Sequence, residues 1–326
     1  MEKIKVGVIG AGNMGKNHIR LTSELPDFEV AGIYDNSENA GQIARQYGVR
    51  VFPEPDELIS SVDAVVIASP SSTHCPLALR AATAGLHTLV EKPLGLNSKE
   101  ALEICDAFMK SQTVLVVGHV ERFNPVVLEA EKLIEQEDVI AINTRRFSPK
   151  DLRINDADVV QDLLIHDLDI VVNCLNKSKI KKLNANGRTA YNERLVDYTH
   201  TIIEFENGIL ATLEASRTTE DKIRDIDIHT RSSYIRMDLL NKSLTITRRT
   251  NYKLDTGYSP AYRQENITEK VFIPMVEPLR AELQDFANCI KSGSIPRVGG
   301  GDALNVLQII DDIKKQIYRE DRDHGK

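Results

Sequence analysis

Short apolar runs alternate with amphipathic stretches between residues 4 and 117. The apolar runs predict strands at residues 4–9, 29–34, 64–68, 88–90 and 114–117. The stretches between them have helical periodicity and predict helices at residues 13–23, 37–47, 76–84 and 98–110, with Ser37 capping the second. Continuously hydrophobic strands that alternate with helices predict an α/β Rossmann domain with a parallel, doubly wound sheet.

After residue 123 the pattern changes to one rich in strands. Strands are predicted at residues 140–147, 180–185, 200–205, 209–216, 226–230, 234–238 and 244–247, and helices at 124–135, 159–175, 279–291 and 303–318. Asn207-Gly208 between two strands predicts a hairpin, and the polar stretch 251–266 predicts a loop. We therefore expect an α+β domain with an open, mostly antiparallel sheet at residues 122–326, after a Rossmann domain at residues 1–121.

Length and composition fit a two-domain globular enzyme. The chain has 326 residues, of which 41% are hydrophobic and 27% charged, with a net charge of -7. That charge argues against a broad nucleic-acid surface. The scattered cysteines form no C-x-x-C pair, which favours reduced, intracellular thiols. We see neither a signal peptide nor an apolar run near the roughly 18 residues of a membrane span, so we expect a cytoplasmic protein with no membrane partner.

The first predicted strand leads into Gly10-Ala11-Gly12-Asn13-Met14-Gly15, a G-x-G-x-x-G that opens a helix. The pattern alone is weak, but this context is the one a dinucleotide site needs. Asp35 ends the second strand, where its carboxylate would accept hydrogen bonds from the adenosine ribose and repel a 2′-phosphate. The sequence therefore favours NAD over NADP. The alternative is a structural glycine turn with a solvated Asp35, and Asn36 and Ser37 could still contact a 2′-phosphate.

Two further loops follow predicted strands, at the sheet edge where ligands bind. One is Ser69-Pro70-Ser71-Ser72-Thr73-His74, which could equally be an ordinary helix cap, and the other is Glu91-Lys92-Pro93. The predicted cofactor-binding residues are Gly10, Ala11, Gly12, Asn13, Met14, Gly15, Asp35, Ser69, Pro70, Ser71, His74, Glu91 and Lys92.

Candidate catalytic groups come from both predicted domains. Lys92, just past a buried strand, would polarise a carbonyl or stabilise an alkoxide. Asp162 and His166 share one helix face at i, i+4 spacing, and histidine exchanges protons near neutral pH. Asp162 would orient His166, with Asp169 as a rival for that role. The alternative is a solvated lysine and a structural histidine.

Together the G-A-G-N-M-G, S-P-S-S-T-H, E-K-P and D-x-x-x-H motifs resemble those of the Gfo/Idh/MocA oxidoreductase family over nearly the whole chain. The resemblance implies that Lys92, Asp162 and His166 line an active site. It also implies a Rossmann domain followed by an open-sheet domain that is often used for oligomer contacts, and hence a homo-oligomer (dimer or tetramer).

Gly118-His119-Val120-Glu121-Arg122-Phe123-Asn124-Pro125 resembles the branch that contains UDP-N-acetylglucosamine 3-dehydrogenases. The alternative for this segment is a domain hinge with a capping Asn124. A nucleotide-sugar diphosphate would need cations, although a run of basic residues is commonly a solvated strand end. The candidate substrate-binding residues are His119, Arg122, Arg145, Arg146, Lys150 and Arg153.

These features predict an NAD(P)-dependent dehydrogenase that transfers a hydride between nicotinamide and a sugar hydroxyl carbon, with C3 of UDP-N-acetylglucosamine as the candidate. The alternatives are an inositol or free-sugar dehydrogenase, a redox-neutral enzyme that uses NAD transiently, and a non-catalytic NAD(P)-binding regulator. We expect no metal site, because His119, His166 and Asp169 do not have the spacing of a ligand set.

Overall fold

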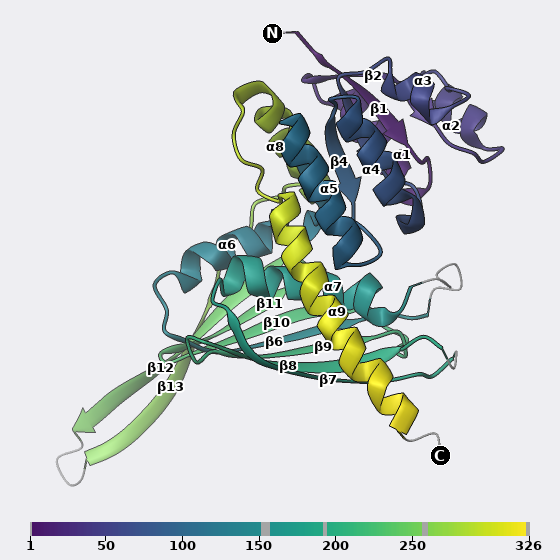
Figure 1. Cartoon of the computed structure of the whole chain (residues 1–326). Coiled ribbons are helices and arrows are strands. Elements are labelled where there is room, and N and C mark those ends of the chain that lie inside the picture. Colours follow the sequence, from purple (N-terminus) through teal and green to yellow (C-terminus); the bar gives the residue numbers. More distant parts are fainter. Residues whose placement is uncertain (1, 151–156, 192–193, 256–259, 324–326) are drawn as a thin grey trace. The chain divides into compact units, whose positions relative to one another are not determined.

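The structure is a computed structural model that describes residues 2–150, 157–191, 194–255 and 260–323. The chain divides into two compact units, shown in Figure 1. Unit 1 comprises Met1–Phe123 and Val276–Asp311, and unit 2 comprises Asn124–Met275 and Asp312–Lys326. The predicted domain boundary after residue 121 lies close to Phe123, where the chain first passes from unit 1 to unit 2. The second domain was expected to be continuous, whereas unit 2 is interrupted by Val276–Asp311 of unit 1.

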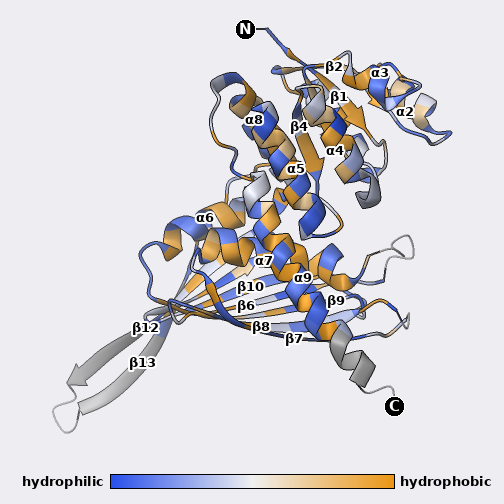
Figure 2. Ribbon diagram, in the orientation of Figure 1, coloured by the Kyte–Doolittle hydropathy of each residue, from blue (hydrophilic) through white to orange (hydrophobic). Residues whose placement is uncertain are grey.

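Unit 1 is built on a parallel five-stranded sheet in the order β2-β1-β3-β4-β5. Its strands are β1 (Ile4–Ile9), β2 (Phe28–Tyr34), β3 (Ala64–Ile67), β4 (His87–Glu91) and β5 (Leu115–Gly118). The strands are largely hydrophobic (Figure 2), as burial on both faces requires. The Rossmann prediction is therefore confirmed. Because β1 lies between β2 and β3, the strand order reverses beside β1, which is where such sheets bind ligands.

The helices of unit 1 are α1 (Asn13–Glu24), α2 (Ala40–Tyr47), α3 (Pro55–Ile59), the short η1 (Ser71–Thr73), α4 (His74–Thr83), α5 (Ser98–Ser111), η2 (Val120–Phe123), α8 (Pro278–Ser292) and the start of α9 (Gly300–Asp323). The prediction that Ser37 caps a helix was wrong. Helix α2 begins at Ala40 after Asn39, with no side-chain cap, and the Ser37 amide donates to Asp35 instead.

Helix α8 belongs to unit 1 because its apolar face completes the core of that unit. Leu283 and Phe286 are buried in the same cluster as Leu21 and Phe28. The rings of Phe28 and Phe286 lie 6.3 Å apart between centroids. Burial of this face corrects the expected domain division, since the stretch around α8 was assigned to the second domain.

Unit 2 contains an eight-stranded sheet in the order β13-β12-β11-β10-β6-β9-β8-β7. Strands β6 and β9 pair in parallel, and the other neighbouring strands of this described sheet pair antiparallel, as predicted. Gly208, with φ 87°, turns the chain between β8 and β9 and confirms the hairpin there. The strands are β6 (Val139–Phe147), β7 (Ile180–Arg188), β8 (Tyr198–Phe205), β9 (Leu210–Ser216), β10 (Ile223–Thr230), β11 (Ser233–Asp238), β12 (Ser243–Asp255) and β13 (Pro260–Lys270).

The loop predicted at 251–266 was wrong. Strands β12 and β13 pair antiparallel from Thr245↔Lys270 to Asp255↔Pro260, so most of this polar stretch is a two-stranded ribbon. Polar residues dominate this stretch, so it contains no apolar run of strand length by which the strands could be recognised.

Helices of unit 2 lie on one face of its sheet (Figure 1). They are α6 (Pro125–Ile134) and a continuous helical stretch made of η3 (Val160–Leu164), α7 (Ile165–Asp169) and η4 (Ile170–Leu175). The prediction of one helix at 159–175 holds in outline, but η3 and η4 are π-helical and α7 alone is α-helical. A π-turn is rare in proteins and is frequent at functional sites.

Candidate active site

The glycine-rich loop after β1 has the shape that a dinucleotide site needs. Gly10 has φ +93°, and a Cβ there would lie 2.6 Å from the backbone of Ala68. A Cβ on Gly15 would lie 1.9 Å from the carbonyl oxygen of Gly10. Around Gly12, by contrast, a Cβ would meet no atom within 4 Å. The first and third glycines therefore close the turn, and the second leaves backbone open to an approaching pyrophosphate.

The N-terminus of α1 has no side-chain hydrogen bond at its N-cap, Gly12. The first amides of a helix lack partners within the helix and carry partial positive charge. Amides of this kind bind phosphate in dinucleotide folds. The residues present at this loop thus fit a dinucleotide cofactor.

Asp35 ends β2 beside this loop, with one carboxylate oxygen accepting the Ala11 amide at 2.5 Å and the other the Ser37 amide at 2.7 Å. Burial acts to raise its pKa, but the hydrogen bonds from Ser37 and Ala11 outweigh it, so that the pKa of Asp35 is lowered. The carboxylate is therefore ionised at neutral pH. Each oxygen has further lone pairs that can accept a ribose hydroxyl.

His74 connects the loop after β3 to the loop after β4. Its Nε2 lies 2.9 Å from the Ser69 carbonyl oxygen and its Nδ1 lies 2.7 Å from the Pro93 carbonyl oxygen. Both partners are acceptors, so a neutral ring donates to one of them at a time. His74 is buried with both nitrogens engaged by protein atoms. His74 therefore holds these two loops together. Ser69 and Ser71 are less buried than His74 and are more accessible to a cofactor.

Glu91 and Lys92 follow β4 at the same edge of the sheet. Glu91 is buried and its Oε1 lies 2.8 Å from His18 Nε2 on α1. Burial acts to raise the pKa of Glu91, but the hydrogen bond with His18 and the nearby charge of Lys92 hold it below its usual value. Lys92 is half-buried, and the peptide bond that joins it to Pro93 is cis. Unit 1 thus places a lysine beside an ionised carboxylate at the edge that carries the glycine loop.

The segment resembling one branch of the family is largely buried within unit 1. His119 and Arg122 are buried, and Arg122 Nη1 donates to Asp302 Oδ2 at 2.7 Å and to the Arg297 carbonyl oxygen at 3.0 Å. Asn124 accepts the Val126 amide at the start of α6, as expected of a capping residue. The segment therefore has a clear structural role at the crossing from unit 1 to unit 2.

In unit 2, the helical stretch that starts at η3 carries both Asp162 and His166. Asp162 lies in the π-helical turn of η3 and His166, half-buried, in α7. Asp162 Oδ2 pairs with Arg217 Nη2 at 3.0 Å. The same guanidinium donates to the Ala157 carbonyl oxygen at 2.8 Å and to that of Asp158 at 3.3 Å. Arg217 therefore fixes the first turn of this helix together with Asp162.

Arg217 is a site residue that the sequence reading missed. Leu213 and Ala215 of β9 face the core, and Arg217 follows at the same alternate spacing. A charged residue at the end of a series of core-facing positions was the signal that could have identified it. Its partner Asp162 is 55 residues away in sequence, which is why the pair escapes motif reading.

The residues flanking His166 on its helix are also fixed. Asp167 is buried and pairs with Arg146 of β6 at 2.7 Å. Asp169, the rival orienter, accepts from the Asn173 side chain at 2.9 Å. Asp162, Asp167 and Asp169 are thus all engaged by neighbours in unit 2. The pairing of Asp162 with His166 stays a prediction from their i, i+4 spacing.

The basic residues expected to bind a diphosphate do not form one cluster. Alternation along β6 turns Arg146 inward to Asp167, whereas Arg145 lies on the opposite face and pairs with Asp225 at 2.9 Å. Lys150 Nζ lies 4.2 Å from the centroid of the Tyr191 ring. Arg153 lies outside the described residues. Since Arg146 and Arg122 are buried and ion-paired, we exclude them from the proposed diphosphate site.

Within the described residues, no group of three or more His, Cys, Asp or Glu side chains could hold a metal ion. None of the described helices combines the length and the hydrophobicity needed to cross a bilayer.

The glycine loop, Asp35 and the parallel sheet define the class of protein as an NAD-binding oxidoreductase. The oxidoreductase-family model for the NAD-binding Rossmann fold matches residues 4–119, and that for the C-terminal alpha/beta domain matches residues 150–320. The chain belongs to the Gfo/Idh/MocA oxidoreductase family.

Similar proteins are dehydrogenases. UDP-N-acetylglucosamine 3-dehydrogenase of Acidithiobacillus ferrooxidans is 32% identical over 89% of this chain and 90% of its own length. The solved structure of that enzyme has a TM-score of 0.87 at 29% identity, covering 97% of this chain and 98% of the other. The scyllo-inositol 2-dehydrogenase (NAD(+)) of Bacillus subtilis is 28% identical over 94% of this chain and 92% of its length. The chain is therefore a dehydrogenase acting on CH–OH groups.

An Agrobacterium radiobacter oxidoreductase solved with NAD+, L-tartaric acid and magnesium has a TM-score of 0.83 over 97% of each chain. At 17% identity, this likeness concerns the fold.

Proposed function

We propose that this dehydrogenase uses NAD to oxidise C3 of UDP-N-acetylglucosamine, with Lys92, Asp162 and His166 as its catalytic residues. The observation that carries the substrate is the 32% identity to a UDP-N-acetylglucosamine 3-dehydrogenase over 89% of this chain. The G-H-x-E-R-F-N-P segment at 118–125 supports the same branch of the family.

The cofactor proposed is NAD, held by the glycine loop, Asp35 and the loops after β3 and β4. When bound, it accepts the hydride from the substrate carbon. The ionised Asp35 bonds the adenosine ribose hydroxyls and repels a 2′-phosphate, so NADP binds more weakly.

The protein residues handle the proton and the charge on oxygen. His166 accepts the proton of the substrate hydroxyl as the carbon is oxidised. The ammonium of Lys92 stabilises the negative charge that develops on that oxygen. Asp162, fixed by Arg217, orients the imidazole. In the reverse direction, His166 returns the proton to the carbonyl oxygen.

For the diphosphate of the substrate we propose Lys150 and Arg153. The side chain of Lys150 lies against Tyr191, an arrangement that holds the ammonium without neutralising it by an acid. We further propose that the protein is cytoplasmic and that it is a homo-oligomer, the latter as the family resemblance implies.

The test is NADH formation by the purified protein with NAD and a panel of substrates, with a carbonyl trap that pulls an unfavourable oxidation forward. The panel contains UDP-N-acetylglucosamine, other UDP-sugars, inositols and free hexoses. NADH with UDP-N-acetylglucosamine alone supports the proposal. NADH with inositols alone selects the second candidate, which the 28% identity to scyllo-inositol 2-dehydrogenase favours. NAD binding without NADH on any substrate contradicts the proposed substrate.

A further inference from the structure

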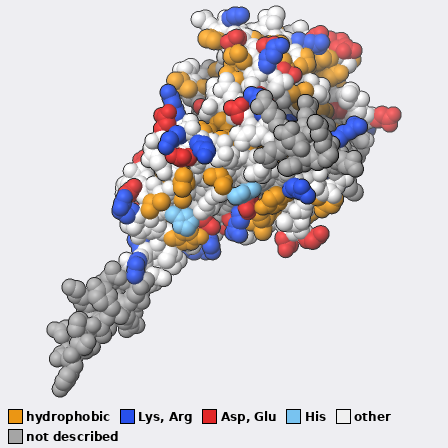
Figure 3. All heavy atoms as spheres, turned by 60° about the horizontal axis from the view of Figure 1, so that its bottom comes forward, with side chains coloured by type: hydrophobic (Ala, Val, Ile, Leu, Met, Phe, Trp, Pro, Cys, Tyr) orange, Lys and Arg blue, Asp and Glu red, His pale blue; other side chains and the backbone are white. Residues whose placement is uncertain are grey.

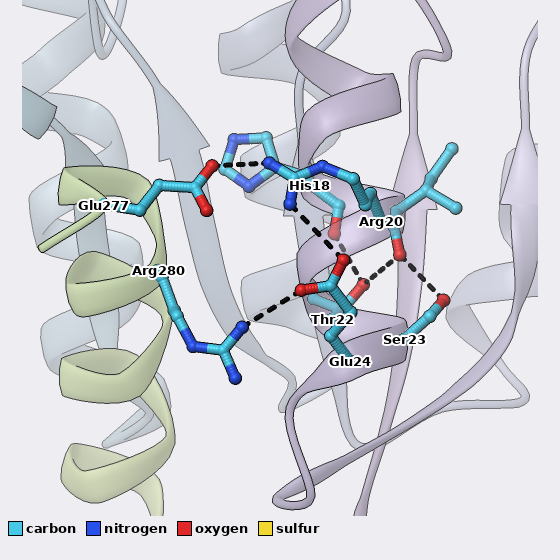
Figure 4. Close-up of polar contacts among 8 residues, drawn as sticks. His18, Arg20, Thr22, Ser23, Glu24, Glu277 and Arg280 are labelled. Carbon is cyan, nitrogen blue, oxygen red and sulfur yellow. Dashed lines mark hydrogen bonds and ion pairs between the residues drawn. The ribbon is translucent and has the colours of Figure 1, made fainter.

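Helices α1 and α8 pack together in unit 1, with an ion-paired rim outside and ionisable groups buried inside. Figure 4 shows the rim, in which Arg20 pairs with Glu277 and Glu24, and Arg280 pairs with Glu24 at 3.0 Å. Beneath it lie His18 of α1 and Glu282 of α8, both with 0% exposure, and Glu91 at the end of β4 with 7%. Burial of three such groups in one place is costly unless each is paired or neutral.

His18 and Glu91 pair directly. His18 Nε2 lies 2.8 Å from Glu91 Oε1, and this pair joins α1 to the end of β4. Gly118, opposite Glu91 on β5, makes room for it, since a Cβ there would lie 2.8 Å from Glu91 Oε2. The carboxylate is therefore enclosed on one side by β5 and held on the other by a histidine.

The second oxygen of Glu91 serves Lys92. Glu91 Oε2 accepts the Lys92 backbone amide at 3.2 Å, and the charge of Lys92 helps to lower the pKa of Glu91. One carboxylate thus bonds the backbone of the proposed catalytic lysine and supplies the negative charge near its ammonium.

Glu282 differs from Glu91 in having no partner. Neither of its carboxyl oxygens has a hydrogen-bond partner among the described residues. Burial first, and then the negative charges of Glu91 and Asp285, raise the pKa of Glu282 well above its usual value. Burial and these charges therefore favour the protonated, neutral form of Glu282. In that form Glu282 does not compete with Glu91 for His18 or Lys92.

We propose that Glu91, held by His18, is a positioning residue for Lys92, fixing both the backbone and the charged end of the lysine for catalysis. This inference rests on the proposed function, because it assumes that Lys92 acts on the substrate. It assigns roles to two residues that touch neither substrate nor reacting atoms.

The first test compares two amides at position 18. In His18→Gln the side-chain N–H lies where Nε2 does and can still bond Glu91, whereas in His18→Asn it is one methylene shorter and cannot. We expect His18→Asn to lower kcat roughly 10- to 100-fold, with the Kd for NAD unchanged, and His18→Gln to retain most of the activity. Equal losses in both variants would overturn the proposal, because the histidine would then act through its volume alone.

The second test needs no substrate. Acetylation of Lys92 by acetic anhydride, followed by mass spectrometry, reports how accessible and reactive its amine is. We expect Glu91→Gln and His18→Asn to raise the acetylation rate of Lys92 several-fold, since the lysine is then no longer held in place beside the buried carboxylate. Glu277→Gln, which alters the rim of the same helix pair, is the control and leaves the rate unchanged.

The two tests separate failure of the inference from failure of the proposed function. An unchanged acetylation rate in Glu91→Gln would refute the positioning role whatever the substrate. A raised rate in a protein that oxidises no substrate of the panel would keep the positioning of Lys92 and reject the proposed reaction.

Discussion

At the scale of single residues, Asp35 links the shape of the nucleotide loop to the choice of cofactor. Its carboxylate accepts amides from both Ala11 and Ser37, so the ends of β1 and β2 are tied together by one ionised group. In the proposed binding mode the same charge faces the part of the cofactor where NAD and NADP differ. The proposal thus makes the loop structure and the cofactor preference depend on one side chain.

We predict that Asp35→Asn narrows the preference for NAD over NADP roughly 10- to 100-fold, because a charged hydrogen-bond acceptor is worth about 1.5–3 kcal/mol. Separate titrations of NAD and NADP measure the two Kd values. Glu38→Gln removes an exposed carboxylate nearby and is the matched control. Equal changes in both variants would mean that general charge, and not the position of Asp35, sets the preference.

The raised pKa of buried Glu282 leads us to expect an unusual dependence of the protein's stability on pH. The pKa of Glu282 in the folded protein is raised well above its usual value, so the folded state keeps a proton that the unfolded state loses as pH rises. The contribution of protonated Glu282 to the free energy of unfolding is fully present below about pH 4.5. It is lost as the pH rises through the pKa of Glu282 in the folded protein. Other charged groups near it are Glu91 and Asp285, with Glu121 and Arg122 in η2, which packs on α8.

We therefore predict that Glu282→Gln is more stable than the wild type near pH 8 and gains less, or nothing, near pH 5. Urea unfolding at both pH values measures the difference in free energy. A gain of the same size at both pH values would show that Glu282 does not carry the proton.

Other residue roles were only partly predictable. The glycine loop and Asp35 could be found because their function depends on local spacing in one strand–turn–helix unit. His18 and Glu282 could not, because their roles arise from contacts among α1, β4 and α8. The sequence could have shown that Arg145 and Arg146 lie on opposite faces of the sheet, since neighbouring residues of a strand face opposite sides.

At the scale of elements, the helical stretch that carries His166 combines three features that fix it. Two π-helical segments flank the α-helical turn. Arg217 holds its beginning, and Arg146 pairs with Asp167 beside His166. Such a stretch presents Asp162 and His166 on a rigid support, which general-base catalysis needs.

We predict that Arg217→Ala lowers kcat roughly 10- to 100-fold while leaving the Kd for NAD unchanged. The variant frees Asp162 and removes the bonds to the carbonyl oxygens of Ala157 and Asp158. Steady-state kinetics and NAD titration provide the measurements. Arg231→Ala, which breaks an exposed ion pair with Asp138, is the control, and equal kinetics in the two variants would contradict the role of Arg217.

Long elements with a clear hydrophobic period were predictable, and elements without such a period were not. The strands of the parallel sheet and the helices against it lie close to their expected positions, because burial imposes a clear period on the sequence. The ribbon of β12 and β13 was missed over much of its length because its sequence there is mostly polar. The short helix α3 also escaped, since five residues give too little periodicity to detect.

At the scale of the whole molecule, the chain enters unit 2 at Asn124 and returns to unit 1 at Val276. No local pattern reveals such a return, because α8 has the amphipathic sequence of any surface helix. Its destination depends on the complementary core around Phe28 and Leu21. The sequence therefore predicts the two folds but not the assignment of α8.

The outer face of the sheet in unit 2, opposite to its helices, combines apolar and ion-paired side chains. Ile202 is 44% exposed and Leu210 is 50% exposed on neighbouring strands, on the same face as the Arg145–Asp225 pair. Figure 3 views this side and shows hydrophobic groups among charged ones. The two exposed, large hydrophobic side chains are the observation that favours this face. We propose that the homo-oligomer contact lies here.

The assignment predicts that Ile202→Lys dissociates the oligomer, because two copies would bring buried, like charges together in the contact. Light scattering after size-exclusion chromatography would show the wild type as a dimer or tetramer and the variant at lower mass. Met109→Lys places the same charge at a 71% exposed position on α5 and should retain the wild-type mass. A monomeric wild type would remove the proposed oligomer. An oligomer that resists Ile202→Lys would place its contact on another surface, leaving the open sheet without that role.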